Sequence, residues 1–195
     1  MEISERQLEI IEAASGLLTR QGLMGLTIKN LAKEMEFSES AIYRHFASKE
    51  EIIVTMLTYL RVDMQGRLAQ ALQCSTHPVD QLRAVFANQF DFFARHNHFV
   101  IIILSEGLLE YTEAVQQALL SLVLTKKAIL DDIVERAQKE GIFSSDYSTE
   151  FLTHTIMGTF RLLMLKWRMA GFSFNLPEMG NSMLDQTLAL LQSKP

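Results

Sequence analysis

The chain is short of cysteine, proline and glycine, and each shortage excludes a class of protein. Its 195 residues contain one cysteine, Cys74, so no disulfide can form within the chain and a reducing compartment is expected. Three prolines and nine glycines leave few breaks in a chain that is 48% hydrophobic, which favours helices over strands and over disorder. We therefore expect an all-α fold with about nine helices.

Targeting and membrane segments are also missing. The N-terminus, MEISERQLEI, carries acids where a signal peptide carries cations, and no apolar run approaches the ~20 residues of a membrane span. We expect a cytoplasmic protein that has no membrane partner. The net charge of −5 argues against a broad nucleic-acid surface, so any DNA contact has to come from a few well-placed groups.

The most informative pattern lies in residues 27–52, TIKNLAKEMEFSESAIYRHFASKEEI. Thr27 and Ser38 are typical N-caps, each followed by a short helix with one apolar face, and a tight turn at residues 35–37 separates the two helices. Ser48 then begins a capping box that opens a long helix. Two short helices around a tight turn predict a helix-turn-helix, which presents its second helix to the DNA major groove.

Periodicity and cap residues predict the other helices. A first helix runs from Ser4 to about Gln21 and ends at Gly22, ahead of the motif. The remaining helices are predicted at about residues 49–73, 78–95, 98–109, 112–140, 149–170 and 177–192. We expect a helix-turn-helix domain over residues 1–50 and a helical ligand-binding and dimerisation domain over residues 51–195.

The motif resembles the N-terminal signature of the tetracycline-repressor (TetR/AcrR-like) family over about residues 8–52. The matching residues are Thr27, Leu31, Ala32, Ser38, Ala41, Ile42, Tyr43, Phe46, Lys49 and Glu50. The resemblance implies a ligand-responsive repressor that binds a palindromic operator on double-stranded DNA as a homodimer and is released by a hydrophobic small molecule. Three departures lie in the turn, where Met35-Glu36-Phe37 replaces the usual Ala-Gly-Val. Glu36 at the glycine position implies either modest strain from a left-handed backbone or a slightly different turn.

Two groups of residues are predicted to contact DNA. Ser38, Glu39, Ser40 and Ala41 begin the second helix of the motif, where side chains reach base edges. The family resemblance implies that a second group holds the phosphates, namely Thr27, Tyr43, His45 and Lys49. Lys29 and Arg44 lie close enough to assist them. Cations counted twice in a dimer predict a salt dependence on the order of four to six charges.

The body carries an apolar population rich in methionine and aromatic residues, which suits an irregular effector cavity as well as plain core packing. The candidate ligand-binding residues are Tyr59, Met64, Phe86, Phe90, Phe93, Ile103, Tyr111, His154, Met157, Phe160 and Arg161. His154 and Arg161 lie seven apart and therefore on one helix face. Arg161 either holds an anionic ligand group or pairs with an acid at a dimer interface.

The helix at about residues 149–170 is apolar on nearly every side between Leu162 and Trp167, so it needs cover on several faces. A dimer in which the last two helices of each subunit form a four-helix interface would supply that cover. The candidate dimerisation residues are Gly158, Leu165, Met183, Leu184, Leu188 and Leu191. Gly158 either permits close helix approach in that interface or packs within one subunit.

Other functions leave little trace in the sequence. We find no catalytic triad spacing, phosphate loop or zinc pattern, and His96 and His98 lack a third ligand, so we predict neither an enzyme nor a metal or cofactor site. The alternative is a helical small-molecule carrier or adaptor of the same fold that no longer binds DNA. The unusual turn and the acidic head motivate that alternative.

Overall fold

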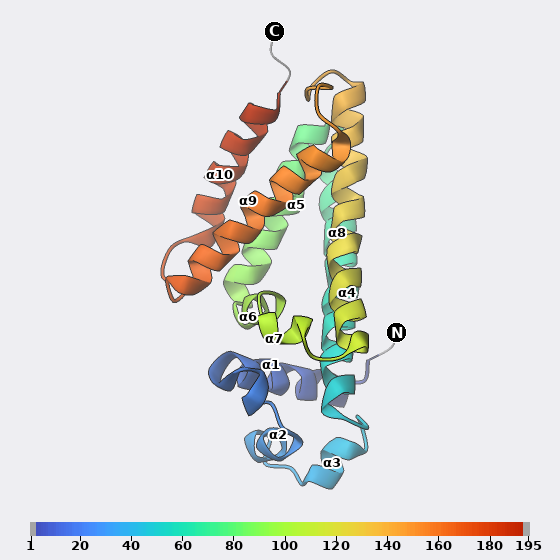
Figure 1. The fold of residues 1–195 in the computed structure, drawn as a ribbon, viewed down its shortest axis with the longest axis vertical. Helices are drawn as coiled ribbons and strands as arrows, with labels where there is room; N and C mark the ends of the chain where they lie inside the picture. The colour runs from blue at the N-terminus through green and yellow to red at the C-terminus, as the bar shows by residue number, and fades with distance from the viewer. Residues whose placement is uncertain (1–2, 193–195) are drawn as a thin grey trace. The chain divides into compact units, whose positions relative to one another are not determined.

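Helices make up nearly all of the computed structural model, which describes residues 3–192. The predicted all-α class is confirmed, with ten α-helices and one 3-10 turn over the described residues (Figure 1). They are α1 Glu5–Gly25, α2 Ile28–Glu34, α3 Glu39–Tyr43, α4 Lys49–Ala71, η1 Leu72–Cys74, α5 Pro78–Arg95, α6 His98–Ile103, α7 Glu106–Leu109, α8 Glu113–Lys139, α9 Thr149–Met169 and α10 Leu176–Leu191. None of the helices over residues 3–192 combines the length and the hydropathy of a membrane span.

Side-chain caps fix the starts of the first three helices, as the sequence predicts. Ser4, Thr27 and Ser38 each accept a hydrogen bond from the backbone N–H three residues on. Gly22 has a φ of 66°, which ends the first helical run and leaves one further turn up to Gly25. That dihedral is open to glycine at little cost, so the predicted stop is confirmed.

One capping contact and one helix boundary differ from the expectation. At α4, the Glu51 N–H binds Ser48 Oγ at 3.1 Å as a capping box requires, but the Glu51 carboxylate accepts from Ala47 N–H at 2.6 Å. The predicted helix over residues 98–109 is two helices, because the backbone of Ser105 is extended. Serine competes for backbone hydrogen bonds and therefore favours such a break over a helix interior.

The chain packs into two compact units. The first contains the described residues up to Val62 together with His98–Leu122, and so holds the helix-turn-helix. In it α1 packs on α2 and α6, and α2 packs on α3. The core residues include Ile10, Leu17, Leu31, Ile42, Phe46 and Ile52, each at most 1% exposed.

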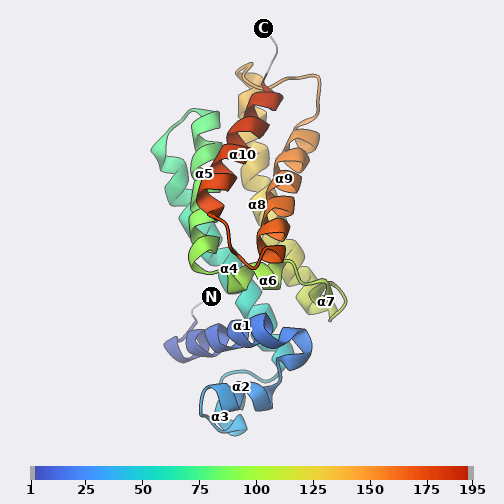
Figure 2. The same cartoon turned by 90° about the vertical axis from the view of Figure 1, so that its left-hand side faces the viewer.

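The second unit contains Asp63–Asn97 and the described residues from Val123 onward. Here α10 packs against both α5 and α9, which lie beside it in Figure 2. The buried side chains include Leu82, Phe86, Phe90, Ile133, Ile156, Leu163, Trp167 and Leu188. The C-terminal part of α4 also belongs to this unit, so one continuous helix contributes to both.

Candidate nucleic-acid interface and body cavity

The second helix of the motif, α3, lies at the surface of the first unit. Ile42 and Phe46 are buried and hold α3 in place, while Glu39 and Ser40 are exposed at its N-terminal end and Ala41 is half-buried. The Ser38 hydroxyl accepts from the Ala41 N–H at 3.2 Å and lies 2.9 Å from the Ser40 hydroxyl. Three short side chains and one carboxylate therefore form the tip that a DNA groove would meet.

The turn before α3 contains a left-handed residue. Glu36 has a φ of 56°, so of the two alternatives the chain adopts the strained one. Two contacts hold the turn: the Phe37 N–H binds the Ala32 carbonyl at 2.8 Å, and the Arg6 guanidinium lies 5.2 Å from the Phe37 ring centroid. Met35-Glu36-Phe37 therefore forms a turn with a strained, left-handed residue at its centre.

Most of the predicted phosphate-binding residues lie on the surface. Thr27, Lys29 and Arg44 are exposed, and Tyr43 is 52% exposed. No ion pair joins Lys29 or Arg44 to another residue within the described range. His45 is half-buried, and its carbonyl accepts from Gln7 Nε2 at 3.3 Å. Free cations beside exposed hydroxyls are suited to bind a phosphate backbone.

Lys49 differs from the other predicted phosphate-binding residues because its amine already has partners. Lys49 Nζ donates to the Leu23 carbonyl at 2.7 Å and lies 5.2 Å from the Tyr111 ring centroid. Burial lowers the pKa of Lys49 from its ordinary value. In this structure Lys49 therefore joins α4 to the end of α1.

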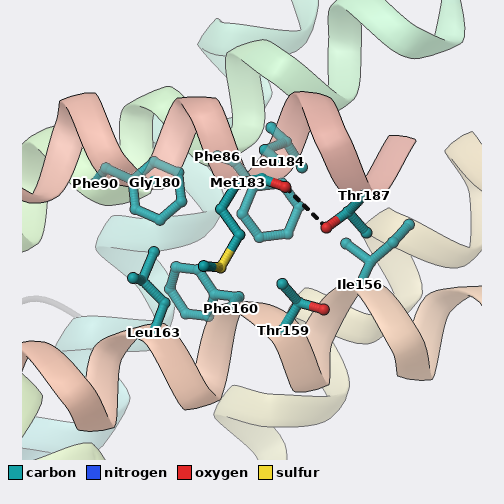
Figure 3. A pocket seen from close by; sticks show the side chains of 10 residues that line it. All are labelled: Phe86, Phe90, Ile156, Thr159, Phe160, Leu163, Gly180, Met183, Leu184 and Thr187. Atoms are coloured by element: carbon teal, nitrogen blue, oxygen red, sulfur yellow. Dashed lines mark hydrogen bonds between the residues drawn. The ribbon is translucent and has the colours of Figure 1, made fainter. Parts of the chain in front are cut away.

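A small cavity lies between α5, α9 and α10 in the second unit (Figure 3). Its volume is about 10 Å³, roughly the room for one water molecule. Figure 3 shows Met183 pointing from α10 toward Phe160 on α9. The lining residues are Phe86, Phe90, Ile156, Thr159, Phe160, Leu163, Gly180, Met183, Leu184 and Thr187.

Three of the predicted ligand-binding residues, Phe86, Phe90 and Phe160, line this cavity. The other eight lie elsewhere. Met64 and Phe93 are buried in the second unit away from the lining, and Met157 is half-buried there. Tyr59, Ile103 and Tyr111 belong to the first unit.

His154 and Arg161 share one face of α9, as predicted, but that face is exposed. The residues two positions further along, Ile156 and Leu163, are buried and line the cavity. A step of two residues turns an α-helix by roughly 200°, so the cavity lies on the opposite side of α9 from the two polar side chains. The two polar side chains therefore do not line this cavity.

The candidate dimerisation residues are likewise divided between buried and exposed positions. Leu184, Leu188 and Leu191 are buried within the subunit, and Met183 is half-buried at the cavity. Leu165 is 39% exposed, and Gly158 is exposed, with open space within 4 Å of the point where a Cβ would stand. Gly158 therefore does not pack against a neighbour within the described part of its own subunit.

Sequence reasoning missed one charged group in the body. Lys126 on α8 is 7% exposed, and its ammonium lies 3.3 Å from the Phe160 ring centroid and 4.7 Å from that of Phe86. The signal was present in the sequence, because Lys126 stands four residues after Leu122 and four before Leu130. This spacing places it within a buried helical stripe.

A capped helix-turn-helix with an exposed second helix, followed by a helical body, defines the class of helical DNA-binding regulators. Comparison with known proteins narrows the class. The family model of bacterial regulatory proteins of the tetR family matches residues 10–56, and that of the tetracyclin repressor-like C-terminal domain matches residues 78–190. The chain belongs to the TetR family of transcriptional regulators.

Similar proteins include several regulators. The uncharacterized HTH-type transcriptional regulator YuxN of Bacillus subtilis is 30% identical to this chain over 115 residues. The matched segment is 59% of this chain and 40% of the length of YuxN. The HTH-type transcriptional repressor KstR2 of Mycobacterium tuberculosis is 20% identical over 94% of this chain and 91% of its own length.

Solved structures share the fold at low identity. The ketosteroid transcriptional regulator KstR2 of Mycobacterium tuberculosis covers 99% of this chain and 98% of its own, with a TM-score of 0.82 at 20% identity. FadR of Bacillus subtilis, solved in complex with stearoyl-CoA, covers 93% of this chain and 97% of its own, with a TM-score of 0.84 at 20% identity.

Proposed function

We propose that this chain is a ligand-responsive transcriptional repressor, a homodimer that binds a palindromic operator and is released by a hydrophobic small molecule. The observation that carries the proposal is the exposed tip of α3, held by a Ser38 cap and by buried Ile42 and Phe46. Residues 1–50 serve as the DNA-binding domain and residues 51–195 as the ligand-binding and dimerisation domain.

In this proposal α3 enters the major groove. Glu39, Ser40 and Ala41 meet base edges, and a glutamate there favours a cytosine amino group. The phosphates on either side are held by two cations, Lys29 and Arg44. The Thr27 and Tyr43 hydroxyls and His45 contact them as well. We assign Lys49 to the packing of the head, because its amine already bonds the Leu23 carbonyl.

The dimer interface is proposed on the outer faces of α9 and α10. Leu162 and Met169 on α9 are 58% and 78% exposed, and Leu165 and Gly158 lie on the same helix. Exposed apolar residues in such number on one helix mark an association surface. Pairing α9 and α10 of one subunit with those of its partner would form a four-helix interface.

The cavity between α5, α9 and α10 is the proposed effector site. Its lining is apolar, as small-molecule sites usually are. Two structural relatives, a ketosteroid regulator and a regulator in complex with stearoyl-CoA, support a hydrophobic effector. Because α4 runs through both units, an effector that opens the second unit can change the position of the head through this helix.

A gel-shift titration with DNA from upstream of the protein's own gene tests the proposal. We expect one dimer to bind a palindromic site and an apolar extract of the host to weaken that binding. A protein that binds components of the extract but no DNA would instead be the carrier or adaptor.

A further inference from the structure

The second unit buries a positive charge that has no hydrogen-bonding partner. Lys126 Nζ has no acceptor within reach among the described residues, although the side chain is 7% exposed. Asp131, five residues further along α8, pairs through its Oδ2 with Lys127 at 2.7 Å. A buried ammonium is costly unless a partner compensates its charge, so an anionic partner would stabilise this site.

Aromatic rings supply part of the missing compensation. The ammonium lies 3.3 Å from the Phe160 centroid and 4.7 Å from the Phe86 centroid. Phe86 and Phe160 are themselves in contact, with centroids 5.4 Å apart. A desolvated cation–π contact is weaker than a hydrogen-bonded ion pair in the same surroundings, so an anion would displace a ring from the ammonium.

These two rings also line the cavity, so the charge and the cavity share a wall. The polar lining groups offer little else to a ligand. The Thr159 hydroxyl donates to the Thr155 carbonyl at 3.0 Å, and the Thr187 hydroxyl donates to the Met183 carbonyl at 2.9 Å. Lys126 is therefore the strong polar group with unused hydrogen-bonding capacity at this wall.

We propose that Lys126 binds the carboxylate of an apolar carboxylic acid whose hydrocarbon part occupies the cavity among Phe86, Phe90 and Phe160. The inference rests on the proposed function, because it takes this cavity as the effector site. A cavity of about 10 Å³ holds no such molecule, so binding has to move lining side chains. Phe160 is half-buried, and displacing its ring would open the cavity to the ammonium while the ion pair replaces the cation–π contact.

The ionisation of the amine agrees with this assignment. Burial lowers the pKa of Lys126 to about 7 in the free protein. A carboxylate beside the amine would favour its charged form and raise that pKa again.

The test is direct binding of matched acids and alcohols to the full-length protein by calorimetry. The probes are the straight-chain acids from hexanoate to palmitate and phenylbutyrate, each compared with the alcohol of the same skeleton. We expect at least one acid to bind about thirtyfold or more tightly than its alcohol, and Lys126→Met to abolish that preference. Lys139→Met, an exposed lysine on the same helix, should keep the preference.

Two results would overturn the inference: binding of no acid, or equal binding of acid and alcohol to the wild type. If Lys126→Met fails to fold, the comparison on the wild type decides, and Lys126→Gln serves as the second variant. Operator binding without any probe is measured in parallel. If the wild type binds operator but does not prefer the acid, the carboxylate site alone is refuted. If it does not bind operator, the proposed function is refuted.

Discussion

At the scale of single residues, Glu36 occupies the turn of the helix-turn-helix in a backbone conformation that costs free energy. Its left-handed backbone joins α2 to α3, and a non-glycine residue there costs roughly 1 kcal/mol. Glu36→Gly should therefore raise the free energy of unfolding by up to about 1 kcal/mol in a urea titration. Lys33→Gly, in the regular part of α2, should lower it by about the same amount. Two changes of the same sign would contradict this account of the turn.

Lys126 predicts an unusual dependence of stability on pH. Its pKa is about 7 in the folded protein and 10.5 in the unfolded reference. Below about pH 7 both states bind the proton, and the full cost of the buried charge is present. As pH rises from 7 to 10.5 the unfolded state binds more protons than the folded state, so this cost is progressively lost and stability rises.

Lys126→Met should consequently be the more stable protein near pH 6, by an amount on the order of a few kcal/mol. The difference from the wild type should shrink toward zero near pH 10. Urea titrations of both proteins at the two pH values measure it. A difference that stays constant with pH would mean that the ammonium is not buried.

Residue-scale prediction succeeded where the cause is local. The caps at Ser4, Thr27 and Ser38 follow from the side chain and the next few residues. At Glu36 the sequence left two alternatives open, and the positive φ selects the strained one. The burial of Lys126 depends on rings from α5 and α9, so spacing along α8 marks the position without showing what surrounds it.

At the scale of helices, the approach of α10 to α5 depends on Gly180. A Cβ at this position would come within 2.6 Å of the Phe90 ring, which is 2% exposed and packed on Phe86 and Phe160. Gly180→Ala should therefore lower the free energy of unfolding by about 1–3 kcal/mol, although alanine is the better helix former. Gly158→Ala, with open space at its Cβ, provides the control in a monomeric, dilute sample. Equal effects of the two changes would contradict the packing described.

The outer face of α9 predicts a second outcome at this scale. Leu165→Glu puts a charge into the proposed interface and should shift the protein from dimer to monomer in sedimentation experiments. Leu109→Glu on α7 changes a leucine of comparable exposure, at 52%, outside that interface, and should leave the dimer intact. A wild-type monomer, or a dimer indifferent to Leu165→Glu, would remove the interface from the proposal.

Helix positions were predictable to within a few residues, whereas helix faces were less so. Pro78, Gly141 and Pro177 mark ends that local chemistry sets. The apolar sequence of α9 did not show which side faces the cavity, because apolar residues occupy nearly every side of it between Leu162 and Trp167. His154 and Arg161 consequently became ligand-binding candidates from their shared face alone, and α9 exposes both. Only packing against α5 and α10 distinguishes the two sides.

At the scale of the whole molecule, recognition is assigned to the first unit and effector binding to the second. The chain links them through α4 and α8, each of which contributes residues to both units. Coupling between the sites requires an effector that binds one arrangement of the body better than another. An effector that binds the protein equally well with and without operator would exclude such coupling.

The central claim, that the head binds DNA through α3 and its neighbouring cations, is tested most directly by fluorescence anisotropy on the upstream DNA at several salt concentrations. Lys29 and Arg44 counted in both subunits predict a decrease in log affinity with log salt on the order of four. Arg44→Ala should weaken binding about tenfold or more and reduce that slope, while Arg83→Ala, on the exposed surface of α5, should change neither. Affinity that is flat with salt and indifferent to Arg44→Ala would contradict the account.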